Sequence, residues 1–224
     1  MSNSDFETRI DRLLELIQKP APTGLFNPWR DQDDELDRPD AAAIRSENLK
    51  QYLLAHQGAD AVLVGEACGW AGCRFTGIPF TGENLLDGAE ALDWTRGRKL
   101  QRSSMRTEPY RERSATIVWG EIAGDRTLVL WNAVPWHPHR PGEALTNRRP
   151  TRLEQEAGRE ALEAFMKIFD DAEPVAIGRV SEEVLSRLGF EAGYIRHPSM
   201  GGHRQFRKGV RELRERLTCP SRVR

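Results

Sequence analysis

Three short stretches of this chain are almost uniformly apolar. They cover residues 61–64, 127–131 and 174–177, and a Gly or Asn follows each of them. Apolar runs of this length, without alternating polar residues, are typical of strands that are buried on both faces of a parallel sheet. The pattern therefore predicts parallel strands that end at turns.

Helical spacing appears before and between these runs. Apolar residues recur every three or four positions at 5–18, and again at 153–169, where Leu153 belongs to the apolar side. Ser181 can cap a third helix that runs to Leu188. Helices that alternate with short strands predict an α/β fold, a three-layer αβα sandwich with a short, mainly parallel central sheet.

Two segments do not follow either pattern clearly. Residues 114–122 fit a short capped helix and a strand equally well. Residues 83–113 form a long, basic, partly irregular insertion, and long loops of this kind are usually functional or mobile.

The length of 224 residues predicts a single domain over 1–224, with a mobile N-terminal segment and a basic C-terminal tail. No apolar stretch approaches the roughly 18 residues of a membrane helix, and the first residues contain no secretory hydrophobic segment. We therefore expect a cytoplasmic protein that does not contact membranes. Three cysteines, at 68, 73 and 219, lack the spacing of a disulfide framework or a four-cysteine metal site.

Charge is distributed unevenly, although the net charge is only −1. Residues 31–40 contain six acids and one Arg, whereas 96–113 contain seven bases and two acids, and 196–224 contain nine bases and two acids. Such runs are usually solvated surface faces. The last basic segment begins inside a candidate site loop, however, which favours a surface that faces nucleic acid.

Three polar loops follow strand-like runs, and they contain Glu66, Asn132 and His197. In an open parallel sheet, ligands bind beyond the carboxyl ends of the strands, where the connecting loops converge. The sequence therefore predicts that these three side chains belong to one site.

These loops also carry a family resemblance. Together, the runs Gly65-Glu66-Ala67-Cys68-Gly69, Gly77-Ile78-Pro79-Phe80-Thr81-Gly82, Trp131-Asn132 and His197-Pro198-Ser199 resemble the motifs of the uracil-DNA glycosylase superfamily, in the same order, over about residues 60–215. Two positions depart from the pattern, since Cys68 replaces the usual Pro and Ala67 replaces an Asp or Asn. The cysteines of the iron–sulfur branches are missing, so the resemblance implies no cofactor.

The resemblance implies a monomeric DNA repair enzyme that flips uracil out of DNA and hydrolyses its N-glycosidic bond, leaving an abasic site. Phe80 would stack on the base, and Asn132 would pair with O4 and N3–H of uracil. His197 would donate to O2, while Glu66 would orient the attacking water. Further contacts are expected from the following residues: Gly65, Ala67 and Gly69 with the base, Ser199, His203 and Arg204 with phosphates, and Met200 in the gap left by the flipped base.

Other interpretations stay open on the sequence alone. Phe80 could anchor a turn in the core, Asn132 could cap a turn, and Glu66 could hold its loop through backbone N–H groups. His137 and His139, with a third His, could form the metal site of a metal-dependent hydrolase. The chain could also be a nucleic-acid-binding protein with the glycosylase fold but lost or altered activity.

Overall fold

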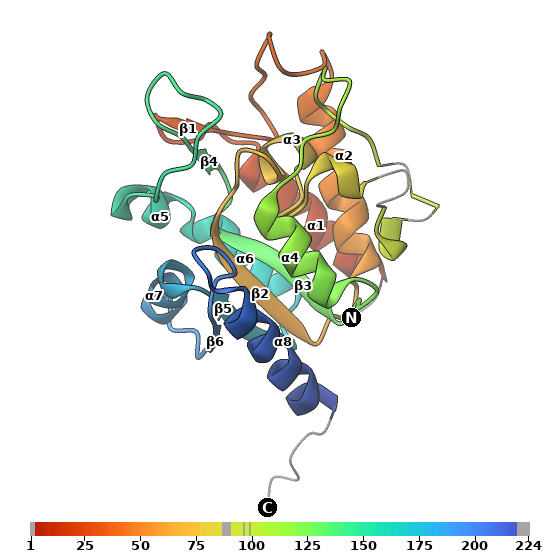
Figure 1. Cartoon of the computed structure of the whole chain (residues 1–224), viewed down its shortest axis with the longest axis vertical. Coiled ribbons are helices and arrows are strands. Elements are labelled where there is room, and N and C mark those ends of the chain that lie inside the picture. The colour runs from red at the N-terminus through yellow and green to blue at the C-terminus, as the bar shows by residue number, and fades with distance from the viewer. Residues whose placement is uncertain (1–2, 87–90, 96, 99, 219–224) are drawn as a thin grey trace, which may run out of the picture.

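Four parallel strands form the central sheet of the computed structural model, which describes residues 3–86, 91–95, 97–98 and 100–218 (Figure 1). The strand order is β3-β2-β5-β6. The strands cover Ala61–Ala67 (β2), Leu128–Val134 (β3), Glu173–Ile177 (β5) and Gly193–Ile195 (β6). All three strands predicted from apolar runs are confirmed, and β6 leads directly into the loop that contains His197.

Helices cover both faces of this sheet. They are α1 (Asn3–Ile17), α2 (Ala41–Ala55), α3 (Cys73–Thr76), α4 (Arg113–Ile122), α5 (Arg152–Ala157), α6 (Arg159–Ile168), α7 (Arg179–Arg187) and α8 (His203–Thr218). In Figure 1, α4 and α8 pack together in front of the sheet, and α1 and α6 pack together behind it. The predicted three-layer αβα sandwich is therefore confirmed.

Shorter elements complete the chain. Two 3₁₀ turns, Glu83–Leu85 and Asp93–Thr95, lie in the insertion, and β1 (Leu25–Phe26) pairs antiparallel with β4 (His137–Pro138). None of the helices in the described part of the chain is long and apolar enough to cross a membrane.

Several element boundaries differ from the sequence predictions. The expected helix at 153–169 is two helices that meet at Gly158, where a Cβ would lie 2.8 Å from the carbonyl oxygen of Ala133, so this close approach to β3 requires Gly. Leu153 is 84% exposed instead of buried, since α5 presents it to solvent. Helix α7 begins at Arg179, so Ser181 is not its N-cap, and its hydroxyl donates to the carbonyl of Ile177. The ambiguous segment 114–122 is helical.

Both ends of the described chain are helices with a buried apolar side. The apolar side of α1 is buried, and its Phe6 packs edge-on against Phe169 at 5.7 Å between ring centroids. This packing ties residues 3–17 to the core, and the mobility expected of the N-terminal segment stays a prediction. The basic C-terminal region forms α8 as far as Thr218, and the rest of the predicted tail, 219–224, lies outside the described residues.

The acidic segment 31–40 is not simply a solvated face. Asp37 is buried and forms ion pairs with two buried guanidinium groups, those of Arg45 at 2.5 Å and Arg74 at 3.3 Å. Glu83, at the start of the insertion, is also buried and accepts from the backbone N–H and hydroxyl of Ser104 at 2.9 and 2.6 Å. These buried carboxylates fix the described parts of both segments beside the sheet.

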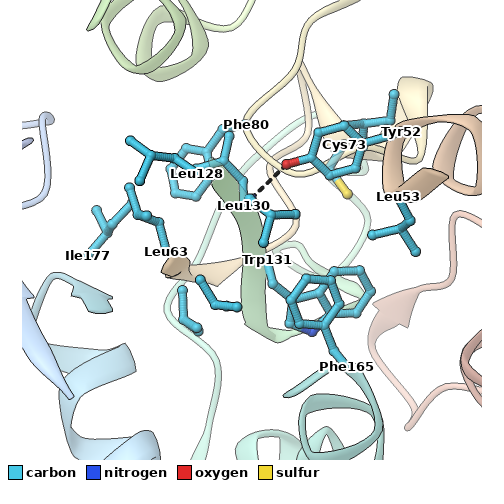
Figure 2. Packing of buried hydrophobic residues seen from close by; sticks show 14 of the residues in the cluster. Tyr52, Leu53, Leu63, Cys73, Phe80, Leu128, Leu130, Trp131, Phe165 and Ile177 are labelled. Atoms are coloured by element: carbon cyan, nitrogen blue, oxygen red, sulfur yellow. Dashed lines mark hydrogen bonds between the residues drawn. The ribbon is translucent and has the colours of Figure 1, made fainter. Parts of the chain in front are cut away.

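Strand β3 lies at the edge of the sheet, where its outward N–H groups have no neighbouring strand. Tyr52 of α2 closes one of these positions, because its hydroxyl accepts from the N–H of Leu130 at 2.6 Å (Figure 2). On the same strand, Trp131 stacks on Phe165 of α6 at 4.4 Å between centroids. Contacts from helices α2 and α6 thus fix the position of β3, the strand that contains Asn132.

Tyr52→Phe should therefore destabilise the fold by about 1–3 kcal/mol, because the buried N–H of Leu130 loses its acceptor. Urea denaturation monitored by circular dichroism measures this change. Tyr194→Phe is a matched control, since Tyr194 is partly exposed, and should change stability by no more than about 0.5 kcal/mol. Equal stability of the Tyr52→Phe variant and the parent would show that this bond is not needed at the sheet edge.

Candidate active site

A cavity of about 640 Å³ lies at the carboxyl edge of the sheet, where the loops after β2, β3 and β6 meet. It brings together most of the residues predicted from the sequence. The predicted residues that line it are Glu66, Ala67, Gly69, Phe80, Asn132, His197, Ser199 and Met200. Gly65 lies directly beneath it, whereas His203 and Arg204 are not among its lining residues and lie at the start of α8.

The ring of Phe80 rests on the backbone of β2. Its φ of +52° is unusual for a residue other than Gly, and it directs the ring toward Gly65. A Cβ at Gly65 would lie 2.3 Å from the ring and 2.8 Å from Oδ1 of Asn132, so only Gly fits at this position. Phe80 is part of the buried core and also lines the cavity, which gives the cavity an aromatic wall.

The amide of Asn132 lies beside this ring with unused hydrogen-bonding capacity. Asn132 is 2% exposed, and its Oδ1 is buried without a hydrogen-bond partner among the described residues. A buried acceptor without a donor destabilises the unliganded protein, by about 1–3 kcal/mol in typical cases. A ligand that offers an N–H group in the cavity would remove this penalty, so the amide is suited to recognition rather than to capping a turn.

His197 is held as a neutral hydrogen-bond donor. The backbone N–H of Ser199 donates to Nδ1 at 3.2 Å, and the Ser199 hydroxyl lies 2.8 Å from the same nitrogen. Because an N–H group can only donate, Nδ1 is the acceptor and Nε2 carries the proton of the neutral ring. Burial, with a smaller contribution from Arg196, lowers the pKa of His197 to about 4. The ring is therefore neutral at pH 7, and its centroid lies 6.0 Å from that of Phe80.

Glu66 projects from the end of β2 into the same cavity. Burial raises the pKa of its carboxyl, and the positive charge of Arg149 opposes this change. The structure gives Glu66 no hydrogen bond to a backbone N–H group within the described chain, so it does not support the alternative in which Glu66 holds its own loop. Its carboxylate is thus available to water or a ligand above its raised pKa.

Several lining residues were not predicted from the sequence. They come from two segments far from the motifs, and they are Glu112, Ser114, Asn147, Arg148 and Arg149. Arg148 is fixed by a double hydrogen bond to Glu154 at 2.6 and 2.8 Å. The consecutive Arg148 and Arg149 were a visible signal of a basic site, whereas nothing in the local sequence distinguished Glu112 from a surface acid.

The loop after His197 leads from the cavity to the surface. Met200 is at its tip, 92% exposed, with a φ of +52°. His203 and Arg204 follow as the first two, exposed, residues of α8, and helix N-termini favour anions. Arg207, one turn later, is paired with Glu121 at 2.7 Å. Ser199 contacts His197, so it positions the ring in addition to any contact with DNA.

The ring nitrogens of His137 and His139, the possible metal ligands, lie near backbone carbonyl oxygens instead. His137 is fully buried, with Nδ1 3.0 Å from the carbonyl of Cys68 and Nε2 3.2 Å from that of Ala144. Nδ1 of His139 lies 2.9 Å from the carbonyl of Arg140. Over the described ranges, no group of three or more His, Cys, Asp or Glu side chains could hold a metal ion. The geometry favours a structural role for His137.

Comparison with known proteins identifies a similar fold but assigns the chain to no family. No protein-family model matches the chain, and no curated protein sequence matches it. Among solved structures, wild-type SMUG2 from Pedobacter heparinus is similar, with a TM-score of 0.59 and 13% identity over 92% of this chain and 97% of that one. At this identity the similarity establishes a shared fold along nearly the whole chain.

The state of His197 can be measured directly. NMR titration of ring nitrogens should show the Nε2–H tautomer at pH 7 and a pKa of about 4. Arg196→Gln should raise this pKa, because it removes a positive charge that disfavours the protonated ring. Arg211→Gln, a change at an exposed position on α8, should leave the pKa of His197 unchanged. A pKa near 6.5 in the parent would contradict the buried, neutral ring.

Proposed function

We propose that this protein is a DNA glycosylase that removes uracil from DNA. The observation that carries the proposal is the content of one cavity: an aromatic wall, an unpaired buried amide oxygen, a neutral imidazole donor and a carboxylate. The motifs that supply these groups resemble the uracil-DNA glycosylase superfamily, and the fold is shared with SMUG2 from Pedobacter heparinus.

Recognition of the base follows from the wall and the amide. A uracil that leaves the DNA stack can lie against Phe80, and stacking of this kind contributes about 1–3 kcal/mol per base. The amide of Asn132 can then accept from N3–H and donate to O4. Cytosine offers an acceptor at N3 and an amino group at C4, so both contacts would be mismatched.

The chemical step breaks the bond between C1′ of deoxyribose and N1 of uracil. The electron pair of that bond leaves with the base, so negative charge grows on the uracil ring while the sugar becomes cationic. His197 would stabilise the charge at O2 through Nε2–H. The carboxylate of Glu66 would stabilise the sugar and orient a water molecule toward C1′. The water oxygen forms the new bond to C1′, and its released proton neutralises the uracil anion.

Binding of DNA would involve a different set of residues. Met200 is exposed at a loop tip, where an apolar side chain can fill the gap left by the flipped base. Arg204 lies at the N-terminus of α8, makes no ion pair within the described part of the chain, and can contact a phosphate. Arg207 is a weaker candidate because Glu121 already neutralises it.

Cleavage of defined oligonucleotides tests the proposal. Single- and double-stranded oligonucleotides that contain uracil, hypoxanthine or thymine are incubated with the protein in EDTA, and abasic sites are revealed by alkaline cleavage. We expect cleavage at uracil, without added metal, and none at thymine. Binding of uracil-DNA without any abasic product would instead favour the alternative of a glycosylase-fold protein that binds nucleic acid and has lost catalysis.

Replacement of the two chemical groups should separate chemistry from binding. Glu66→Gln and His197→Ala should each lower the single-turnover cleavage rate by about 100-fold or more, because they act mainly on charge in the transition state, while DNA affinity changes little. Arg204→Ala should do the opposite: weaken binding to all sequences and reduce its salt dependence by about one unit. Parent rates in the Glu66 and His197 variants would show that the catalytic assignment is wrong.

A further inference from the structure

Glu112 is a buried carboxyl group in the cavity wall that the mechanism above does not use. It precedes α4 and extends toward the loop that follows β2. Two glycines of that loop make room for it, since a Cβ at Gly69 would lie 2.8 Å from Oε1 and a Cβ at Gly72 would lie 1.9 Å from Oε2. The wall beside Gly69 is therefore formed by the Glu112 carboxyl.

This position has a cost that packing alone does not explain. Glu112 is the N-cap residue of α4, where a side-chain oxygen can accept from backbone N–H groups of the first turn. Its side chain makes no such bond, and Oε2 is buried without a hydrogen-bond partner among the described residues. A buried, unpaired carboxyl oxygen is destabilising, so its place in a ligand cavity points to a partner that arrives with the ligand.

Burial also controls the charge of this group. It raises the pKa of Glu112 to about 7, and burial is its only cause. The titratable and charged groups that line the same cavity are Glu66, Cys68, Arg148, Arg149 and His197, and the Cys68 thiol interacts electrostatically with Glu112. On its own segment, Arg111 and Arg113 are exposed. Below pH 7 most of the Glu112 side chains carry an O–H group, which is a hydrogen-bond donor.

We infer that Glu112 contacts the base held in the cavity and donates a hydrogen bond to it through its carboxylic O–H. This inference rests on the proposed function. A neutral donor stabilises a base on which negative charge develops, whereas a carboxylate at the same place would repel that charge. Glu112 is thus a specificity residue that selects bases with an acceptor atom on this side, and its contribution is lost as pH rises through about 7.

The test uses an oligonucleotide with an uncleavable 2′-fluoro-deoxyuridine, compared with the same oligonucleotide without uracil. The preference of the parent for the uracil analogue should fall about 10-fold between pH about 6 and about 8.5. Glu112→Gln keeps a donor that does not titrate, so its preference should change less than about 3-fold over the same range. Glu108→Gln, an exposed carboxyl of the same segment, is the control and should behave as the parent.

The same decline in Glu112→Gln and in the parent, or no decline in the parent, would overturn the role of Glu112. Infrared spectra of the parent give a second measurement that needs no variant: the carbonyl band of a protonated carboxyl should shift when the analogue binds, and an unshifted band would also overturn it. A parent that shows the pH-dependent preference but cleaves no uracil would refute the glycosylase function and leave the Glu112 contact intact. If the parent cleaves uracil but Glu112→Gln shows the same pH dependence of binding preference as the parent, the glycosylase function stands and the Glu112 contact is refuted.

Discussion

The site depends on one close contact, that between the ring of Phe80 and the bare backbone of Gly65. The ring can reach the strand only because residue 65 has no side chain, and the same gap admits Oδ1 of Asn132. Phe80 and Asn132 come from segments more than 50 residues apart, yet both meet at this point of β2. The left-handed backbone of Phe80 is the local strain that this contact offsets. The aromatic wall and the amide that we propose recognises the base therefore form a single packed unit.

Burial is the second constraint that shapes this site, because it changes the pKa values of three titratable groups in the same cavity. It lowers the pKa of His197 to about 4 and raises those of Glu66 and Glu112. A neutral imidazole and a neutral carboxylic acid can each donate a hydrogen bond without bringing a charge to a departing anion. Arg149 opposes the effect only at Glu66, which favours the ionised form for the one group assigned to water and the sugar. The surroundings of each group, and not its residue type, therefore favour neutral hydrogen-bond donors at His197 and Glu112 and an ionised carboxylate at Glu66.

The sequence predicted those features that depend on local pattern. Uniform apolar runs identified the strands β2, β3 and β5, and the polar residues that end the first two identified Glu66 and Asn132. His197 was identified from the loop that follows β6, and it joins the other two because parallel strands bring their carboxyl ends to one edge. Helix α2 was not predicted, because its buried face includes the polar Arg45 and Asn48, so its apolar residues form no clear stripe in the sequence. Helix α8 was also missed, although Phe206, Val210 and Leu213 have helical spacing within the basic segment.

Features that depend on tertiary contact could not be predicted in this way. Asp37 looked like one acid in a solvated run, and only the fold brings two buried arginines to it. Glu112 is distant in sequence from the glycines that accommodate it, so no motif or spacing marks it as a cavity residue.

The central claim is that this cavity holds an extrahelical base between the Phe80 ring and the Asn132 amide. A crystal structure of the protein with DNA that contains 2′-fluoro-deoxyuridine tests it most directly. We expect the uracil ring to stack on Phe80, with its N3–H donating to Oδ1 of Asn132 and its O2 near Nε2 of His197. A uracil that stays stacked in the DNA, or DNA bound away from the cavity, would contradict it.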